Sequence, residues 1–141
     1  MWLTDASQDA LDVARANAAG LGVSGNGVRF AKGDWWGALP AHLRGSLDLV
    51  VSNPPYIAST VISDLMPEVS RFEPRAALDG GTDGLAAYRL IANAAPRLVA
   101  PGGWLIVEVG AGQAGPVANL ARATSRYETA QVTPDFQGIA R

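Results

Sequence analysis

The 141-residue sequence contains no cysteine, one histidine (His42), and no apolar run that approaches the length of a membrane span. Without cysteine the chain forms neither a disulfide framework nor a thiolate zinc site. Crossing a bilayer takes about 20 apolar residues, so no membrane association is expected, and the N-terminus has no signal-type segment. These absences predict a cytoplasmic protein. His42 lies in a polar connection and is expected to be a solvated surface residue.

Positive charge is also scarce, with 11 Lys and Arg residues against 13 Asp and Glu residues and a formal net charge of -2. The chain therefore lacks the broad basic surface with which proteins bind a nucleic-acid backbone, and nucleic acid is not expected as a direct substrate. At 48% hydrophobic and 17% charged residues, the sequence is too apolar for a disordered chain. Its length allows one domain with one core.

Apolar segments typical of strands alternate with segments of helical periodicity. Strands are expected over residues 2–4, 28–31, 47–52, 104–109 and 129–133. Helices are expected over residues 7–21, 85–98 and 113–123. This alternation predicts a mostly parallel sheet with helices on both faces, an α/β fold of Rossmann-like type. Residues 57–83 are read as a long loop with at most one helical turn, and such loops beside a sheet are often functional.

The apolar strand over residues 47–51 is expected to be buried and leads into the segment Ser52-Asn53-Pro54-Pro55-Tyr56. Each proline forces the preceding residue into an extended conformation, so the segment fixes the direction of the Asn53 side chain. The Asn53 side-chain carbonyl and the Pro54 main-chain carbonyl then offer two acceptors for one NH2 group. The Tyr56 ring could stack on that group or face a cationic sulfonium. The alternative is a plain turn with a packed tyrosine.

Acidic residues follow the first two expected strands. Asp5 stands between a strand and a helix, where dinucleotide-type folds bind ribose hydroxyls, but it could equally serve as a helix-start residue. Asp34 could accept from an adenine amino group, and the indole of Trp35 could cover the adenine ring. In the other interpretation, Trp35 and Trp36 pack against the helix layer. Together, Asp5, Asp34 and Trp35 would describe an adenosine pocket.

The segment Asn53-Pro54-Pro55-Tyr56 resembles the signature of methyltransferases that act on amino groups with S-adenosyl-L-methionine. The segments Arg71-Phe72-Glu73-Pro74 and Ala77-Leu78 narrow the resemblance. Further matching segments are Thr4-Asp5, Gly33-Asp34-Trp35 and Glu108-Val109-Gly110. Over nearly all of its length, the chain is similar to the HemK/PrmC family of release-factor glutamine methyltransferases.

The resemblance implies a Rossmann-like class I methyltransferase that uses S-adenosyl-L-methionine as its cofactor. The methyl group would go to the side-chain amide nitrogen of the glutamine in a Gly-Gly-Gln loop, with peptide chain release factors as partners. Asn53, Pro54 and Tyr56 would be the catalytic residues around this glutamine, and Pro55 would also contact the substrate. No strong general base and no metal is required.

The resemblance also assigns Asp5 to the cofactor ribose and Asp34 and Trp35 to the adenine, with Asn53 beside the cofactor. Arg71 and Glu73 would bind and orient the substrate loop, or would simply pair with each other. Glu108 either lines the site or is a buried acid that stabilises a neighbouring loop.

The sequence departs from the family pattern at both ends. The acidic ribose residue normally follows a glycine-rich first turn by about 20 residues, and Asp5 leaves no room for that turn. We therefore interpret residues 1–141 as a partial methyltransferase catalytic domain without the first strand, the glycine-rich turn or the N-terminal substrate domain. Residues 135–141 resemble the lead-in to a final strand that is missing. We expect a marginally stable or partner-dependent chain with weak or absent cofactor affinity.

Two other functions remain open on sequence alone. Adenine and guanine amino groups would suit the same Asn53–Tyr56 segment, so the chain could methylate DNA or RNA. The acidic composition and the segment Arg71–Pro74 argue against this alternative. The chain could also be a non-catalytic remnant or interaction module that keeps the sheet without a working cofactor site.

Overall fold

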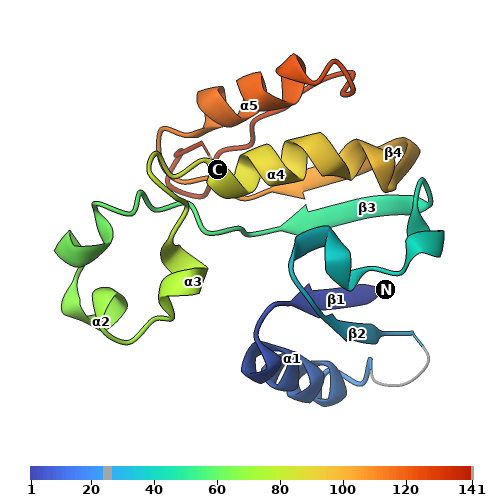
Figure 1. The fold of residues 1–141 in the computed structure, drawn as a ribbon, viewed down its shortest axis with the longest axis horizontal. Helices are drawn as coiled ribbons and strands as arrows, with labels where there is room; N and C mark the ends of the chain where they lie inside the picture. Colours follow the sequence, from blue (N-terminus) through green and yellow to red (C-terminus); the bar gives the residue numbers. More distant parts are fainter. Residues whose placement is uncertain (24–26, 141) are drawn as a thin grey trace. The chain divides into compact units, whose positions relative to one another are not determined.

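The computed structural model describes residues 1–23 and 27–140, which fold into two compact units, Met1–Leu43 and Arg44–Arg141. Each unit contains one pair of parallel strands with helices beside it (Figure 1). The first unit contains β1 (Trp2–Asp5), α1 (Gln8–Gly20), β2 (Arg29–Lys32) and the 3-10 helices η1 (Trp35–Ala38) and η2 (Ala41–Leu43). The second contains β3 (Leu47–Ser52), η3 (Ile62–Asp64), α2 (Pro67–Ser70), α3 (Arg75–Leu78), α4 (Ala86–Ala94), η4 (Ala95–Arg97), β4 (Val99–Val107) and α5 (Ala114–Ala123).

The first unit follows the pattern strand, helix, strand that its sequence predicts. Strand β1 pairs in parallel with β2, from Trp2 opposite Arg29 to Asp5 opposite Lys32. Helix α1 begins after Ser7, whose hydroxyl accepts a hydrogen bond of 3.3 Å from the Ala10 main-chain N–H and so satisfies one exposed donor of the first turn.

The end of α1 differs in one respect from its prediction. The helical spacing of Leu11, Ala14, Ala18 and Leu21 predicts that they share the apolar face. Leu11 and Ala18 are buried in agreement with this, but Leu21 is 78% exposed. Leu21 is the C-cap of the helix, and Gly22 follows with a φ of +69°, so the chain turns away before Leu21 reaches the apolar face.

The second unit is built on β3 and β4, which also pair in parallel. Leu47 lies opposite Val99, but Leu49 lies opposite Trp104. The residues Pro101-Gly102-Gly103 predict a turn, and in the structure they form an irregularity inside β4. A Cβ atom on Gly103 would lie 2.6 Å from Cγ1 of Val99, so this bulge requires glycine. Beyond it the register is regular to Ser52 opposite Val107.

The apolar runs over residues 47–51 and 104–109 predict two buried strands, and this prediction is wrong for one face of the sheet. Leu49, Val51, Trp104 and Ile106 are 53%, 68%, 54% and 52% exposed. They alternate with less exposed residues, so they lie on one face, whereas α4 lies along the other face (Figure 1). The apolar sequence specified strands correctly, but burial depends on a covering layer, which the sequence of a strand does not report.

The core of the second unit centres on α4. The buried apolar residues of this core are Ile62, Ala87, Tyr88, Ile91, Ala92, Ala95, Leu98 and Val109. Helix α4 changes into the 3-10 helix η4 at Ala95, directly before Pro96, where a kink was predicted. None of the described helices is both long and apolar enough to cross a membrane.

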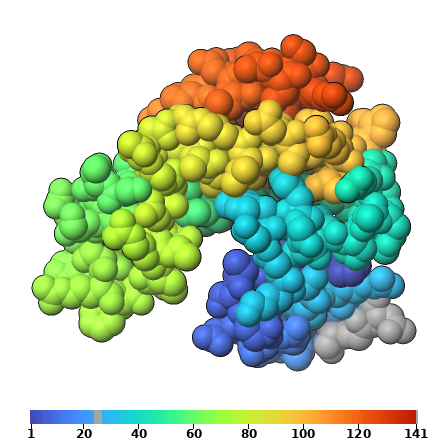
Figure 2. All heavy atoms as spheres, in the orientation of Figure 1, coloured from blue at the N-terminus to red at the C-terminus, as the bar shows by residue number. Residues whose placement is uncertain are grey.

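The segment between β3 and α4 is more regular than its prolines suggest. The predicted helical turn is present as η3, but the prediction of a loop misses α2 and α3, because Pro67 and Pro74 are residues typical of loops. Pro67 is instead the first residue of α2, and Pro74 is the N-cap of α3, positions that proline tolerates. In Figure 2 this green to yellow-green segment projects from the unit below the left end of α4, on the side away from the orange α5.

The strand predicted over residues 129–133 is absent, and that prediction is wrong. The described residues after α5 form only an isolated antiparallel bridge between Pro134 and Ala140. β propensity alone does not make a strand where the chain finds no ladder partner. The segment over residues 135–141 is interpreted as the lead-in to a final strand. Its last residue, Arg141, lies outside the described residues.

Candidate functional site

The Asn53–Tyr56 segment leaves the carboxyl end of β3 as the sequence predicts. The parallel ladder continues for one more hydrogen bond, in which the Glu108 N–H donates to the Ser52 carbonyl at 3.0 Å. Pro54 is buried, whereas Asn53 is exposed. Within the described part of the chain, the Asn53 side chain has no hydrogen-bond partner. A buried proline therefore supports an exposed amide that is available to a ligand.

Main-chain hydrogen bonds hold the segment directly after Tyr56. The Ile57 N–H donates to the Leu78 carbonyl at 2.9 Å, and the Gly80 N–H donates to the Ile57 carbonyl at 2.8 Å. Ile57 thereby forms a parallel bridge with Asp79. The loop that contains Asn53 is consequently anchored at both ends, by β3 before it and by residues 78–80 after it.

The Asp79 carboxylate reinforces this anchor. Its Oδ1 accepts hydrogen bonds from the Ser59 hydroxyl at 2.6 Å and the Gly81 N–H at 2.9 Å, and its Oδ2 accepts from Nε of Arg75 at 3.2 Å. The bond from Ser59 is the main reason that the pKa of Asp79 lies below its usual value. Sequence reasoning read Asp79-Gly80-Gly81 only as turn chemistry and missed this role.

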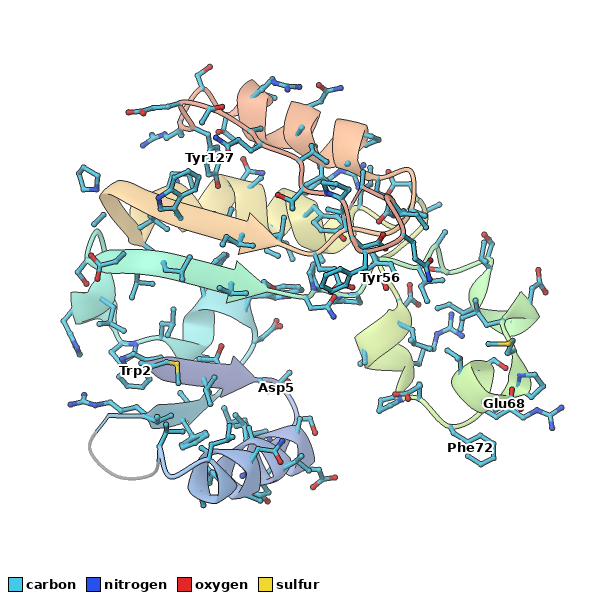
Figure 3. All side chains as sticks on the ribbon, turned by 180° about the vertical axis from the view of Figure 1, so that it is seen from behind. Trp2, Asp5, Tyr56, Glu68, Phe72 and Tyr127 are labelled. Carbon is cyan, nitrogen blue, oxygen red and sulfur yellow. The ribbon has the colours of Figure 1, made fainter. Side chains whose placement is uncertain are left out.

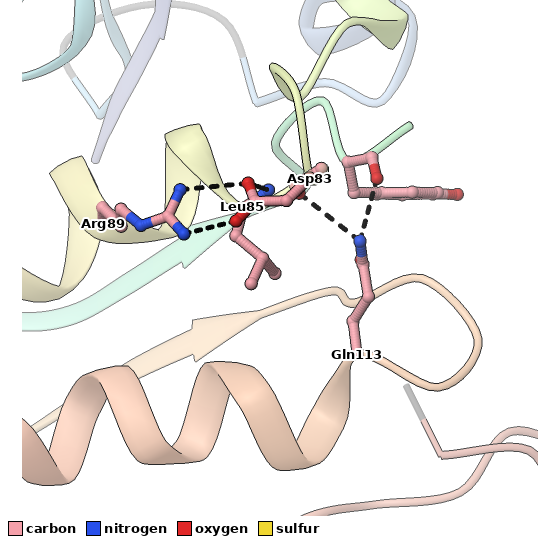
Figure 4. Close-up of polar contacts among 6 residues, drawn as sticks. Asp83, Leu85, Arg89 and Gln113 are labelled. Atoms are coloured by element: carbon pink, nitrogen blue, oxygen red, sulfur yellow. Dashed lines mark hydrogen bonds and ion pairs between the residues drawn. The ribbon is translucent and has the colours of Figure 1, made fainter. Parts of the chain in front are cut away.

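Gln113 is a second residue that sequence reasoning missed. Its Oε1 accepts a hydrogen bond of 3.0 Å from the Gly110 N–H. Its Nε2 donates to the Tyr56 carbonyl at 2.9 Å and to the Gly84 carbonyl at 3.4 Å (Figure 4). No local pattern reveals the contacts with Tyr56 and Gly84, because these residues lie 57 and 29 positions from Gln113 in the sequence.

Tyr88 supports the end of β4 from the core. Its ring is buried, and its hydroxyl donates a hydrogen bond of 2.8 Å to the Glu108 carbonyl. Burial raises the pKa of the Tyr88 phenol to about 12. The Glu108 side chain is exposed, so the interpretation of Glu108 as a buried acid is wrong.

Arg71 and Glu73 lie in the short connection between α2 and α3, and both are exposed. No ion pair joins them in the part of the chain that the structure describes. Phe72 between them is 81% exposed and points away from the helices (Figure 3). The structure thus leaves these side chains available at the surface, and their role in substrate binding stays a prediction.

In the first unit, Asp5 and Asp34 come to the same edge of the strand pair. The Gly33 N–H donates to the Asp5 carbonyl at 3.1 Å, which brings the residue after Gly33 to the end of β1. Oδ1 of Asp5 accepts from the Ser7 N–H at 2.7 Å, as a helix-start residue would, while the side chain stays exposed. Both interpretations of Asp5 are compatible with this arrangement.

Trp35 begins η1 with an unusual backbone conformation. Its φ is 47°, in the left-handed region that residues other than glycine seldom adopt. A Cβ atom on Gly33 would lie 2.8 Å from Cα of Ala38, so the turn around Trp35 is tightly closed. The ring of Trp35 is half-buried. A strained residue beside two exposed acids is typical of a ligand-binding turn, although packing alone would also explain the half-buried ring. The described residues contain no cluster of His, Cys, Asp or Glu suited to a metal ion.

Comparison with known proteins gives a consistent set of relatives. A release factor glutamine methyltransferase of Gloeobacter violaceus is 46% identical over 141 residues, which cover 100% of this chain and 48% of that protein. That of Thermosynechococcus vestitus is 44% identical over 137 residues, or 97% of this chain and 46% of that protein. The chain belongs to the release factor glutamine methyltransferase family. The release factor glutamine methyltransferase of Geobacter sulfurreducens is 58% identical to the chain over 96 residues.

The chain spans about half the length of the curated relatives it matches, between 46% and 48% for those of T. vestitus and G. violaceus. No family model matches the chain.

In this member of the release factor glutamine methyltransferase family, the predicted site residues fall into separate groups. Asn53, Pro54, Pro55 and Tyr56 form one continuous segment of the second unit, and Asp5, Asp34 and Trp35 lie together in the first. Arg71 and Glu73 lie on the projecting segment between α2 and α3. A proposed function therefore has to give a role to each of these three groups of residues.

Proposed function

We propose that the chain carries the substrate-orienting part of a methyltransferase that acts on the glutamine side-chain amide of peptide chain release factors. The observation that carries the proposal is the exposed Asn53 amide on the buried Pro54, directly after β3. The names of the relatives, which are 44% to 46% identical over nearly the whole chain, favour this substrate over a nucleic-acid amino group.

The physical task at Asn53 is orientation of a poor nucleophile. An amide nitrogen donates its lone pair to the adjacent carbonyl, so the rate gain has to come from alignment and from acceptors for the NH2 protons. The Asn53 side-chain carbonyl would accept one N–H of the substrate amide, and the Pro54 main-chain carbonyl the other. Tyr56 and Pro55 would then form the apolar wall beside the aligned amide, while Arg71 and Glu73 would contact the flanking loop.

S-adenosyl-L-methionine would supply an electrophilic methyl group. The residues of the first unit fit its adenosine chemically: Asp5 and Asp34 are exposed carboxylates at one strand edge, and carboxylates accept hydrogen bonds from ribose hydroxyls and adenine amino groups. Trp35 offers an indole face beside them. Asn53 would lie next to the methyl group.

We also propose the fold of the whole catalytic domain to which residues 1–141 belong. Parallel strand pairs joined by helices are compatible with a Rossmann-like methyltransferase sheet, of which residues 1–141 would form part. A cytoplasmic location, in which release factors would be the partners, is part of the proposal.

The proposal is tested by incubating the protein with methyl-labelled S-adenosyl-L-methionine and a release factor that contains a Gly-Gly-Gln loop. Label is expected on that glutamine at a cofactor concentration high enough to offset the weak cofactor affinity expected from the sequence. No label is expected on a release factor in which the glutamine is replaced by alanine. Asn53→Ala is expected to lower kcat by about 100-fold, because misalignment of the amide costs a factor of that order.

Asn93→Ala is the matched control, since Asn93 is an exposed amide on α4 and only bonds the Arg89 carbonyl within its own helix. It should leave kcat unchanged. Label on duplex DNA instead of the release factor would favour the nucleic-acid alternative. An absence of label on both substrates would reject methyl transfer by this chain.

A further inference from the structure

Gln113 occupies the N-cap position of α5 but does not cap the helix. A residue at this position commonly uses its side chain to bond the free N–H groups of the first turn. The Gln113 side chain makes no such bond. Its amide lies instead among main-chain groups of Tyr56, Gly84 and Gly110, at 2.9, 3.4 and 3.0 Å. The side chain is therefore committed to the loop that follows β3.

The three partners together require an amide. Gly110 presents an N–H, which needs an acceptor, whereas Tyr56 and Gly84 present carbonyls, which need donors. A glutamine side chain offers one carbonyl oxygen and two N–H donors, which fixes the orientation of the group. A carboxylate would supply only acceptors and would face two carbonyl oxygens.

Two glycines allow this close approach. A Cβ atom on Gly84 would overlap the Tyr56 carbonyl and lie 2.7 Å from Nε2 of Gln113. A Cβ atom on Gly110 would lie 2.7 Å from Oε1 of Gln113 and 3.0 Å from Cδ2 of the Tyr56 ring. The Tyr56 ring and the Tyr56 carbonyl thus both lie close to the Gln113 amide. Gln113 itself is only partly buried.

We propose that Gln113 is a positioning residue that fixes the direction in which Asn53 and Pro54 present their two acceptors. Pro54 and Pro55 each have a fixed φ, so few torsions remain free between Asn53 and Tyr56. Holding the Tyr56 carbonyl therefore holds the whole segment. The inference relies on the proposed function for the identity of the substrate, but the geometric role of Gln113 is independent of it.

The geometric role is tested by nitrogen-15 NMR of the protein and its Gln113→Ala variant. Loss of the amide is expected to shift or broaden the side-chain NH2 signal of Asn53, which is remote from Gln113 in sequence. Signals from α4 serve as the check that the unit stays folded. A second variant, Gln113→Glu, is tested below. Its matched control is Gln131→Glu, because Gln131 is exposed and the change in charge is the same. An unshifted Asn53 signal in Gln113→Ala would overturn the proposal.

Gln113→Glu adds a test that loss of packing cannot imitate. The introduced carboxyl group is nearly the same size but donates to the Tyr56 carbonyl only when protonated, so its pKa should be raised. As the pH falls through that pKa, the Asn53 signal should return towards its wild-type position, whereas Gln131→Glu should show no such change. An Asn53 signal that stays displaced by the same amount at every pH contradicts the proposal.

Kinetics then separate positioning from the proposed function. With a release factor as substrate, Gln113→Ala should lower kcat by about 100-fold and leave KM for the cofactor nearly unchanged. Gln113→Glu should regain activity at low pH relative to Gln131→Glu. A loss confined to KM would contradict a positioning role. If the wild-type protein transfers no methyl group, the proposed function fails, and the NMR signals of Asn53 alone decide the role of Gln113.

Discussion

At the scale of single residues, the pair formed by Asp83 and Arg89 makes a prediction about pH. The two terminal nitrogens of the Arg89 guanidinium group, Nη1 and Nη2, donate to the Asp83 carboxylate, and the Leu85 N–H donates to Oδ1 of Asp83 at 3.1 Å (Figure 4). The hydrogen bonds from Arg89, followed by the bond from Leu85, lower the pKa of Asp83 from 3.8 to about 2. The folded state therefore binds this proton less readily than the unfolded state does.

We expect Asp83→Asn to be less stable than wild type at neutral pH and to become equally stable in acid. A carboxyl group whose pKa is lowered by folding stabilises the folded state above its unfolded pKa, and this contribution decreases below pH 3.8 and is lost as the pH falls through about 2. The pair is exposed, so the difference should be small. Urea unfolding from pH 7 to pH 2 measures it. A stability difference that is as large at pH 2 as at pH 7 would contradict the assignment.

At the scale of elements, α1 depends on the cap at Ser7. Ser7→Ala removes the acceptor for the Ala10 N–H and should destabilise the first unit by about 1 kcal/mol. Asp5 still accepts from the main-chain N–H of residue 7 in this variant, so only the cap is lost. Hydrogen exchange of the α1 amides is the measurement, with Ser63→Ala at an exposed site as the control. Equal exchange in the two variants would show that the cap contributes nothing.

The exposed face of β3 and β4 makes a second prediction at this scale. Val51→Lys should cost less than about 1 kcal/mol, because the side chain is 68% exposed. It should also reduce self-association, since it places a charge within the apolar set that includes Leu49 and Ile106. Ile91→Ala, at a site only 2% exposed, should cost about 2 to 5 kcal/mol.

Urea denaturation and light scattering at increasing concentration distinguish the two variants. Val51→Lys should keep a urea midpoint close to that of wild type and scatter less light. A loss of stability in Val51→Lys as large as that in Ile91→Ala would mean that the face is covered in solution.

At the scale of the whole molecule, the two units differ in how much apolar surface they bury. Among the described residues, the buried apolar side chains of the first unit are Leu11 and Ala18, whereas the second unit buries a larger set centred on α4. Local opening costs least where few apolar contacts are lost. We therefore expect the amides of α1 to exchange faster than those of α4 in hydrogen-exchange mass spectrometry. Protection of α1 equal to that of α4 would contradict this order.

The sequence predicts local structure in this chain better than long-range structure. The strand over residues 47–52 and the helix after Ser7 follow from patterns of neighbouring residues, and both are confirmed. The exposed amide after β3 was also predictable, because prolines act on adjacent residues. The strand over residues 129–133 is wrong, since its apolar and β-branched residues needed a partner that the described chain does not provide.

The supporting residues of the candidate site were not predictable in the same way. Gln113 stands at the start of an expected helix, where its sequence context predicts nothing beyond a helical or capping residue. Asp79 lies in a glycine-rich turn, and nothing in that turn indicates that Ser59 and Arg75 will bind it. Such roles arise from tertiary contacts, and a single sequence contains no direct signal for them.

The hydrogen bond between Gln113 and Tyr56 has a consequence for the order of events during folding. It joins residues 57 positions apart, and closing so long a stretch of chain carries an entropic cost that local helices do not incur. During synthesis, the Asn53–Tyr56 segment is made well before Gln113 exists. The newborn chain can therefore pair residues close in sequence while this segment is still unfixed, and the segment acquires its final geometry only as the start of α5 docks.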